Sequence, residues 1–202
     1  MQKIPLTQTI LDNHRIDLFY FLTACWVCGK NLHYNFDDYS QTYSFNLTLD
    51  KPKLRVKMNV GRSSSPMKYD EIQVSGGEFI ALIPDTVYEK WFNWVMTKNV
   101  RSRNHYTYLY FYLYFNIMHT KYGWSHSIEQ MEKELNMGHG DICKRIAEFE
   151  TDKLIERSPY QFNAGGFSLS RTYWIPDELK TEEKKYEDAR LEELEHNHII
   201  VN

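Results

Sequence analysis

The sequence predicts an α+β fold, in which an N-terminal α+β region with a β-hairpin precedes a C-terminal helix–turn–helix and a two-stranded ribbon. Two observations predict this class. Residues 41–60 alternate between apolar and polar side chains, which is the period-two pattern of β-strands. Residues 125–176 hold two segments with apolar residues at helical spacing, followed by two short arms that flank a Gly-containing stretch.

The overall composition is that of a globular protein. The chain has 202 residues, enough for one or two domains, and 42% of them are hydrophobic, enough for an ordinary core. No apolar run approaches membrane-spanning length, and the start lacks the charged-then-apolar plan of a signal peptide. The three cysteines (Cys25, Cys28 and Cys143) form an odd, sparse set that favours a reducing compartment. We therefore expect a cytoplasmic protein with no membrane partner.

Charge is distributed unevenly along a chain whose net charge is −3. Residues 177–202 carry nine acidic and four basic side chains, or −5, so residues 1–176 carry 20 basic and 18 acidic ones, or +2. A body so close to neutral holds phosphate only if its bases gather on one face. The acidic segment, residues 177–202, is predicted to be a helical tail.

The N-terminal region combines helices and strands. Apolar residues predict a helix over residues 9–29, ending near Gly29. The alternating pattern predicts a hairpin over residues 41–60. A short strand is predicted at Glu78–Ile83, and Pro84 then marks a helix start, because proline suits the first helical turn.

A basic connector, residues 98–104, is the predicted boundary between the N-terminal region and the next domain. After it, five tyrosines alternate with Thr, Leu and Phe over residues 105–118, and this period of two favours a strand. The length of the segment and its stop at Tyr122–Gly123 favour a helix. A helix–turn–helix needs a supporting helix at this point, so we predict a helix.

Two helices joined by a tight turn follow. Ser127 and Gln130 fit a capping box, which predicts the start of the first helix. Residues 136–138, Asn-Met-Gly, form the turn, because Asn and Gly tolerate a left-handed backbone. Asp141 is predicted to cap the second helix. Apolar residues at spacings of three and four give the buried faces: Ile128, Met131 and Leu135, then Ile142, Ile146, Phe149, Leu154 and Ile155.

The other side of the second helix supplies the candidate DNA-binding residues: His139, Gly140, Asp141, Lys144, Arg145 and Glu148. Lys144 and Arg145 suit phosphates or guanine edges, and Asp141 suits a cytosine amino group. Arg157, Gln161 and Arg171 are predicted to contact the DNA backbone beside the groove, around a flexible ribbon tip at residues 163–166. No catalytic residue, metal-ligand set or cofactor is predicted.

Residues 105–176 resemble the winged helix-turn-helix superfamily, above all the DNA-binding domains of plasmid and phage replication proteins and related transcriptional regulators. The residues that carry the resemblance are SIEQMEKEL at 127–135, ICKRIAEFE at 142–150, LIER at 154–157 and RTYWI at 171–175. Members often have Gly before the Leu-Ile pair, where this chain has Lys153. The resemblance implies a domain that binds double-stranded DNA in transcription control or replication initiation.

Several alternatives stand beside this interpretation. A winged helix also serves as a docking module, so the chain is alternatively a phage-encoded adaptor or inhibitor that uses the winged helix as its docking surface. The N-terminal region and the acidic tail are further candidate surfaces for a protein partner. Cys25 and Cys28 suggest a metal or redox site, although zinc needs about four ligands and a buried Cys usually acts as a small hydrophobe. The tyrosine run suggests a stacking platform for single strands, but packing in the core is the stronger expectation. Self-association through the tail would give a homodimer, which suits a two-fold DNA site.

The sequence thus predicts a non-enzymatic DNA-binding protein in three parts. Residues 1–100 form an α+β region of unassigned role, residues 105–176 form the winged helix-turn-helix domain, and residues 177–202 form the tail.

Overall fold

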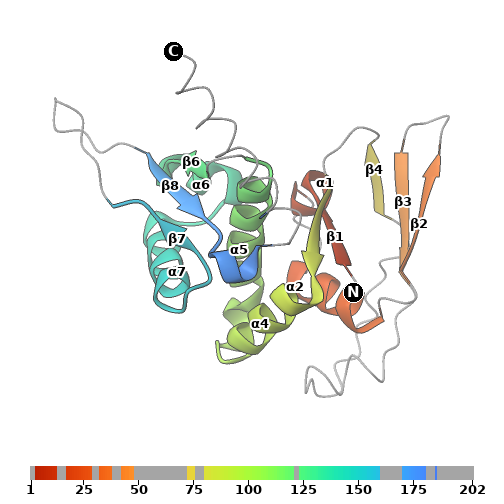
Figure 1. Cartoon of the computed structure of the whole chain (residues 1–202), viewed down its shortest axis with the longest axis horizontal. Helices are drawn as coiled ribbons and strands as arrows, with labels where there is room; N and C mark the ends of the chain where they lie inside the picture. The colour runs from red at the N-terminus through yellow and green to blue at the C-terminus, as the bar shows by residue number, and fades with distance from the viewer. Residues whose placement is uncertain are drawn as a thin grey trace, which may run out of the picture. The chain divides into compact units, whose positions relative to one another are not determined.

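The computed structural model describes residues 3–12, 17–28, 32–37, 42–47, 72–75, 80–120, 123–159, 170–180 and 185. Helices and small antiparallel sheets alternate along these residues, which confirms the predicted α+β class (Figure 1). The chain separates into two compact units, Met1–Tyr108 and Leu109–Asn202. The boundary between them falls inside helix α5 (Arg103–Met118). The three functional ranges given above stay a prediction.

The first unit contains a two-stranded sheet whose strands are far apart in the sequence. Strand β1 (Lys3–Thr7) pairs antiparallel with β5 (Ile80–Pro84), and residues opposite one another, such as Ile4 and Ile83, are buried together. The strand predicted near residue 80 is confirmed. Strand β1 was not predicted, because Pro5 interrupts its pattern and proline usually argues against a strand interior.

A second sheet in this unit has three strands. Strands β2 (Leu32–Asp37), β3 (Thr42–Leu47) and β4 (Ile72–Ser75) pair antiparallel in the order β2-β3-β4. The hairpin predicted over residues 41–60 is therefore wrong in its partner, because β2 and β4 occupy both edges of β3 over Thr42–Phe45. Residues 48–60 lie outside the described residues. Period two identified the strand, but the choice of partner depends on contacts distant in sequence.

The single helix predicted over residues 9–29 is wrong: the structure has α1 (Gln8–Asp12) and α2 (Leu18–Cys28). A capping aspartate, Asp17, precedes α2, and its Oδ1 accepts a hydrogen bond from the backbone N–H of Tyr20 at 3.2 Å. An N-cap supplies partners for the N–H groups that a helix start leaves unpaired. Asp17 therefore begins a new helix inside what reads as one apolar run.

A second side chain completes the start of α2. The Oδ1 of Asn104, in the first turn of α5, accepts from the backbone N–H of Phe19 at 3.2 Å. Burial raises the pKa of the Asp17 carboxyl above its ordinary value, and the N–H groups of Tyr20 and Phe19 offset this only in part. Asp17 is thus a helix cap whose carboxyl is partly buried.

Helix α4 (Asp85–Met96) begins directly after Pro84, as predicted. Its buried face, Val87, Tyr88, Trp91, Phe92 and Val95, forms the core of the first unit together with α2. The hydroxyl oxygens of Tyr88 and Thr23 lie 2.8 Å apart in this core, so each hydroxyl has a polar partner. Burial raises the pKa of Tyr88 far above its ordinary value. Cys25 is also buried here as a free thiol, in agreement with a packing role.

The tyrosine-rich segment is helix α5, which confirms the predicted helix over residues 105–118. Its five alternating tyrosines are all buried, because they lie on a helix that is apolar on every side: Tyr106, Tyr108, Tyr110, Tyr112 and Tyr114. Burial, and to a lesser degree Asp17, raises the pKa of Tyr108 to about 12. These rings are inaccessible for stacking on nucleotides, so the platform alternative is wrong.

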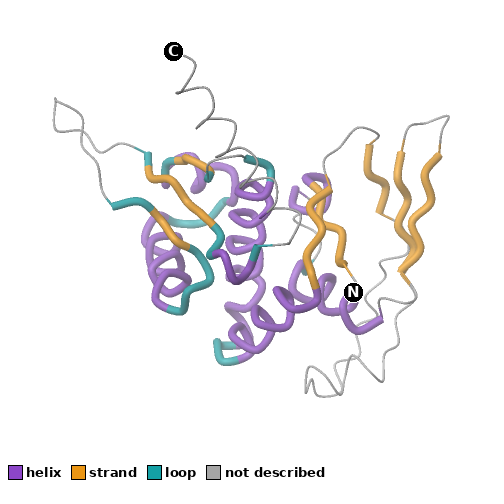
Figure 2. The backbone as a smooth tube through the Cα atoms, in the orientation of Figure 1, coloured by secondary structure: helices purple, strands orange, loops and turns teal. Residues whose placement is uncertain are grey.

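Among its described residues, the second unit combines α-helices with a three-stranded sheet. After α5 come β6 (Trp124–His126), α6 (Ile128–Leu135) and α7 (His139–Thr151), then β7 (Glu156–Arg157) and β8 (Arg171–Trp174). The strands pair antiparallel in the order β6-β8-β7, so the first strand lies beside the last (Figure 2). Helix, strand, helix, turn, helix and ribbon thus follow one another along the chain.

The core of the second unit lies between these helices and the sheet. Met131, Ile142, Ile146, Phe149, Leu154 and Ile155 are buried as predicted, and Ile128 and Leu135 are half-buried. Tyr110 of α5 meets Phe149 of α7 edge-on, with ring centroids 5.6 Å apart. A short 3-10 helix, η3 (Asp177–Leu179), buries Leu179, so the first residues of the predicted tail pack on this unit. Residues 181–184 and 186–202 lie outside the described residues.

Candidate nucleic-acid interface

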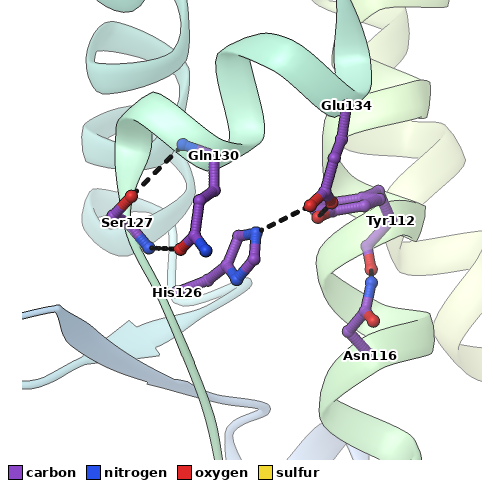
Figure 3. A network of polar contacts seen from close by, with 6 residues as sticks. All are labelled: Tyr112, Asn116, His126, Ser127, Gln130 and Glu134. Atoms are coloured by element: carbon purple, nitrogen blue, oxygen red, sulfur yellow. Dashed lines mark hydrogen bonds and ion pairs between the residues drawn. The ribbon is translucent and has the colours of Figure 1, made fainter.

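Helix α6 is fixed at its start by the predicted capping box. Ser127 Oγ accepts from the backbone N–H of Gln130 at 3.2 Å, and Gln130 Oε1 accepts from the backbone N–H of Ser127 at 3.3 Å (Figure 3). Glu129 adds a carboxylate at the positive end of the helix. The backbone N–H of Glu129 itself, followed by the Ser127 hydroxyl, lowers the pKa of this carboxyl.

The other end of α6 is held by a network around Glu134. The Tyr112 hydroxyl donates to Glu134 Oε2, and His126 Nε2 lies 3.2 Å from Glu134 Oε1 (Figure 3). The His126 ring stacks on Trp124 at 4.4 Å between centroids, which limits its orientation. A carboxylate in the last helical turn is unfavourable to the helix dipole. These contacts with α5 and β6 offset that cost and set the direction in which α6 leads into the turn.

The turn between α6 and α7 has the backbone conformation that its residues predict. Asn136 has φ 50° and ψ 42°, the left-handed conformation predicted for it. Gly138, with φ −72° and ψ 147°, is the N-cap of α7, and the helix begins at His139. The prediction that Asp141 caps this helix is wrong, because the glycine ends the turn early and places Asp141 inside the first turn. An acidic residue in the first turn of α7 still interacts favourably with the helix dipole.

The structure places the predicted α7 residues in different environments. His139, Gly140, Asp141 and Lys144 are exposed, and Glu148 is half-buried. Arg145 is buried, with only 7% of its surface exposed, so its assignment to the outward face is wrong. Arg145 follows Ile142 by three positions and precedes Phe149 by four, which puts it on the apolar stripe. That spacing was available in the sequence, but the charge of Arg145 concealed it.

Arg145 has a polar contact within its own helix. Its guanidinium lies 3.7 Å from Asp141 Oδ1, one turn earlier. The long aliphatic part of an arginine packs well on apolar neighbours while its charged end seeks a carboxylate. Asp141 and Arg145 therefore form an ion pair, and Arg145 does not lie on the exposed side of α7.

The two flanking arginines hold the sheet together. Arg157 Nε donates to Glu150 Oε2 at 2.7 Å, and its other nitrogen lies 2.6 Å from the same oxygen, which ties β7 to α7. Arg171 Nε donates to the Ser158 carbonyl at 2.7 Å, across the base of the ribbon. Gln161 and the predicted ribbon tip, residues 163–166, lie outside the described residues.

A contact that the sequence did not suggest joins α6 to α7. His139 Nδ1 lies 3.2 Å from Glu132 Oε2 across the turn. The two residues are seven positions apart on different helices, so no periodicity pairs them. Only the bend at Asn136 brings them together.

Acidic side chains outnumber basic ones over α6, α7 and β7. Residues 128–157 carry eight acidic and five basic side chains, and two of the five bases are the engaged Arg145 and Arg157. Residues 158–170, which connect β7 to β8, contain no charged residue. Lys144 is the exposed cation that α7 offers.

Other chemistry has little support among the described residues. No group of three or more His, Cys, Asp or Glu side chains in that part of the chain is arranged to hold a metal ion. Among the described helices, none combines the length and apolar character that crossing a membrane requires.

Comparison of the chain with protein-family models, with curated proteins and with solved structures returned no match.

Proposed function

We propose that residues 105–176 form a winged helix-turn-helix domain that binds duplex DNA non-covalently. Helix α5, the pair α6 and α7, and the strands β7 and β8 follow one another in the order expected from the sequence, and β6, which the sequence did not predict, joins their sheet. Asn136 and Lys153 both have left-handed backbones, with φ of 50° and 52°. Lys153 occupies the position where members of the superfamily often have glycine, the residue that most easily takes this conformation.

The observation that carries the proposal is the exposure of the first turns of α7 on a rigid base. In a helix–turn–helix the N-terminal residues of the second helix contact base edges in the major groove. Here His139, Asp141 and Lys144 are exposed at that place, and α6 behind them is fixed at both ends. Lys144 suits guanine or a phosphate, and Asp141 suits the amino group of cytosine. The biological setting that fits is transcription control or replication initiation on a plasmid or phage.

Selection of binding sites from a randomised duplex pool tests this proposal. The full chain is expected to enrich a specific sequence, and Lys144→Ala is expected to weaken binding to it about tenfold, the cost of one base or phosphate contact. Lys153→Asn is the matched control, because it removes the same charge beyond the end of α7 and Asn tolerates the left-handed backbone. Equal losses in both variants, or no enriched sequence, would contradict DNA binding through α7.

The acidic excess on α6 and α7 favours a second candidate, the docking of a protein with a basic surface. In that case the same face would bind Lys- and Arg-rich protein segments and no duplex. Charge reversal separates the two functions: Glu129→Lys should strengthen DNA binding and weaken binding to a basic protein partner. A protein that enriches no duplex yet retains a basic partner sensitive to this change would establish docking.

A further inference from the structure

The contact between Glu132 and His139 holds an exposed histidine ring at the start of α7. His139 is the first residue of α7, and 56% of its side chain is exposed, whereas only 30% of the Glu132 side chain is. Gly138 and Gly140 flank it, and a Cβ added at either glycine would meet nothing within 4 Å. The two residues next to His139 in the sequence therefore have no side chain that could cover its ring.

The chemistry of the pair decides the state of the ring. A carboxylate is an acceptor only, so at 3.2 Å from Glu132 Oε2 the Nδ1 of His139 must carry the hydrogen. In a neutral imidazole the other nitrogen, Nε2, is then an acceptor. Nε2 of His139 has no hydrogen-bond partner among the described residues.

We propose that Glu132 is a positioning residue that fixes the Nδ1–H form of His139, and that His139 Nε2 reads an exocyclic amino group in the major groove. The amino groups of cytosine and adenine are the donors on that edge, whereas guanine and thymine present acceptors there. This inference rests on the proposed DNA binding and names the specificity of that same site. Glu132 acts on the base only through the His139 ring.

Two measurements test it on the full chain. The first is the nitrogen-15 spectrum of the His139 ring in the free protein at pH 8, where a histidine ring is ordinarily neutral. The wild type and Glu132→Gln are expected to show the Nδ1–H form, because the amide oxygen of Gln accepts the same hydrogen. Glu132→Ala is expected to lose it.

The second measurement is base preference at each position of the duplex that the wild type selects. His139→Ala and Glu132→Ala are expected to reduce discrimination about tenfold at the same single base pair, one with cytosine or adenine as the preferred base. Glu132→Gln should restore the preference. Glu156→Ala is the charge control: it removes an equal charge from an exposed position on β7 and should leave the preference intact.

The outcomes separate this inference from the proposed function. An unchanged ring form and an unchanged preference in Glu132→Ala would overturn the positioning role while DNA binding stands. A preference for guanine or thymine at the affected position would overturn the reading by Nε2. If the wild type selects no duplex, the proposed function fails and the base-reading role fails with it, whereas the spectrum still reports whether Glu132 sets the ring form.

Discussion

Lys144 and Arg145 are adjacent cations on α7 with opposite environments. Lys144 is exposed, whereas Arg145 lies on the apolar stripe beside Ile142 and Ile146 and contacts Asp141. A helix turns by about 100° per residue, so neighbours in sequence face different directions. The role of each cation therefore follows from its position on the helix and not from its charge.

Arg145→Ala is expected to lower the free energy of unfolding by about 1–3 kcal/mol, because it removes a buried side chain and leaves space in the core. Lys144→Ala should change it by less than about 0.5 kcal/mol, as is usual at exposed sites. Urea unfolding measures both. Arg145→Met keeps the aliphatic stem and should recover most of the loss. A stability as low as that of the alanine variant would show that the charge, and not the packing, is what matters.

Asp17 gives a prediction for pH dependence. Its pKa is raised in the folded protein, chiefly by burial, so the folded state binds this proton more tightly than the unfolded chain does. The contribution of Asp17 to the free energy of unfolding is fully present below pH 3.8, the pKa of this carboxyl in the unfolded chain. It is lost as the pH rises through the raised pKa of the folded state. Asp17→Asn keeps an oxygen to cap Tyr20, and we expect it to be at least as stable as the wild type at pH 7.

The comparison of unfolding curves at pH 7 and pH 3.5 checks this expectation for Asp17. The advantage of Asp17→Asn should shrink at the lower pH, where the aspartate is mostly protonated in both states. An advantage that is the same at both values, or that grows in acid, would contradict it.

At the scale of elements, the helix–turn–helix depends on contacts at the ends of α6. The capping box fixes its start, Glu134 joins its last turn to α5 and β6, and Glu132 reaches α7. A helix of eight residues is too short to be stable alone, so these contacts and the burial of Met131 supply its stability. The orientation of α7 follows from them.

Two glycines in this region differ in whether their positions have room for a side chain. Gly123, just before β6, has φ +83°, and a Cβ there would lie 2.5 Å from Trp174 Nε1 and 2.8 Å from the Tyr173 carbonyl oxygen. Gly140 lies in the first turn of α7 with open space around it. Gly123→Ala should therefore destabilise the protein by more than about 1 kcal/mol. Gly140→Ala should stabilise it by up to about 1 kcal/mol.

Thermal unfolding of these two single variants provides the measurement, because both add the same methyl group. A tolerated Gly123→Ala would mean that β6 and β8 readily move apart. A destabilising Gly140→Ala would mean that its backbone has a packing role.

At the scale of the whole molecule, the charge distribution limits how the proposed DNA-binding domain would hold a duplex. The net charge is −3 and the acidic excess extends over α6 and α7. Each neutralised phosphate contributes about 0.9 to the salt dependence of binding. Among the described residues of α7, Lys144 is the exposed cation, so the affinity of the proposed domain for DNA would come mainly from fitted contacts at base edges.

The logarithm of affinity for a selected duplex, plotted against the logarithm of salt concentration, should therefore have a shallow slope, no steeper than about −3. Fluorescence anisotropy over a range of salt concentrations measures this slope. A value steeper than about −6 would show that a basic surface outside α6 and α7 contributes most of the binding.

The sequence by itself determined the helices of the second unit, the capping box and the left-handed turn at Asn136. These features depend on residues close together in the chain: apolar spacing places α6 and α7, the length of the tyrosine-rich segment and its place before them indicate α5, and Ser127 with Gln130 marks the start of α6. Only the tertiary structure decided the partners of β3, the burial of Arg145 and the pairing of His139 with Glu132. The pairings depend on which distant segments meet, and Arg145 needed a core that could surround it, because local spacing leaves the fate of a charged side chain open.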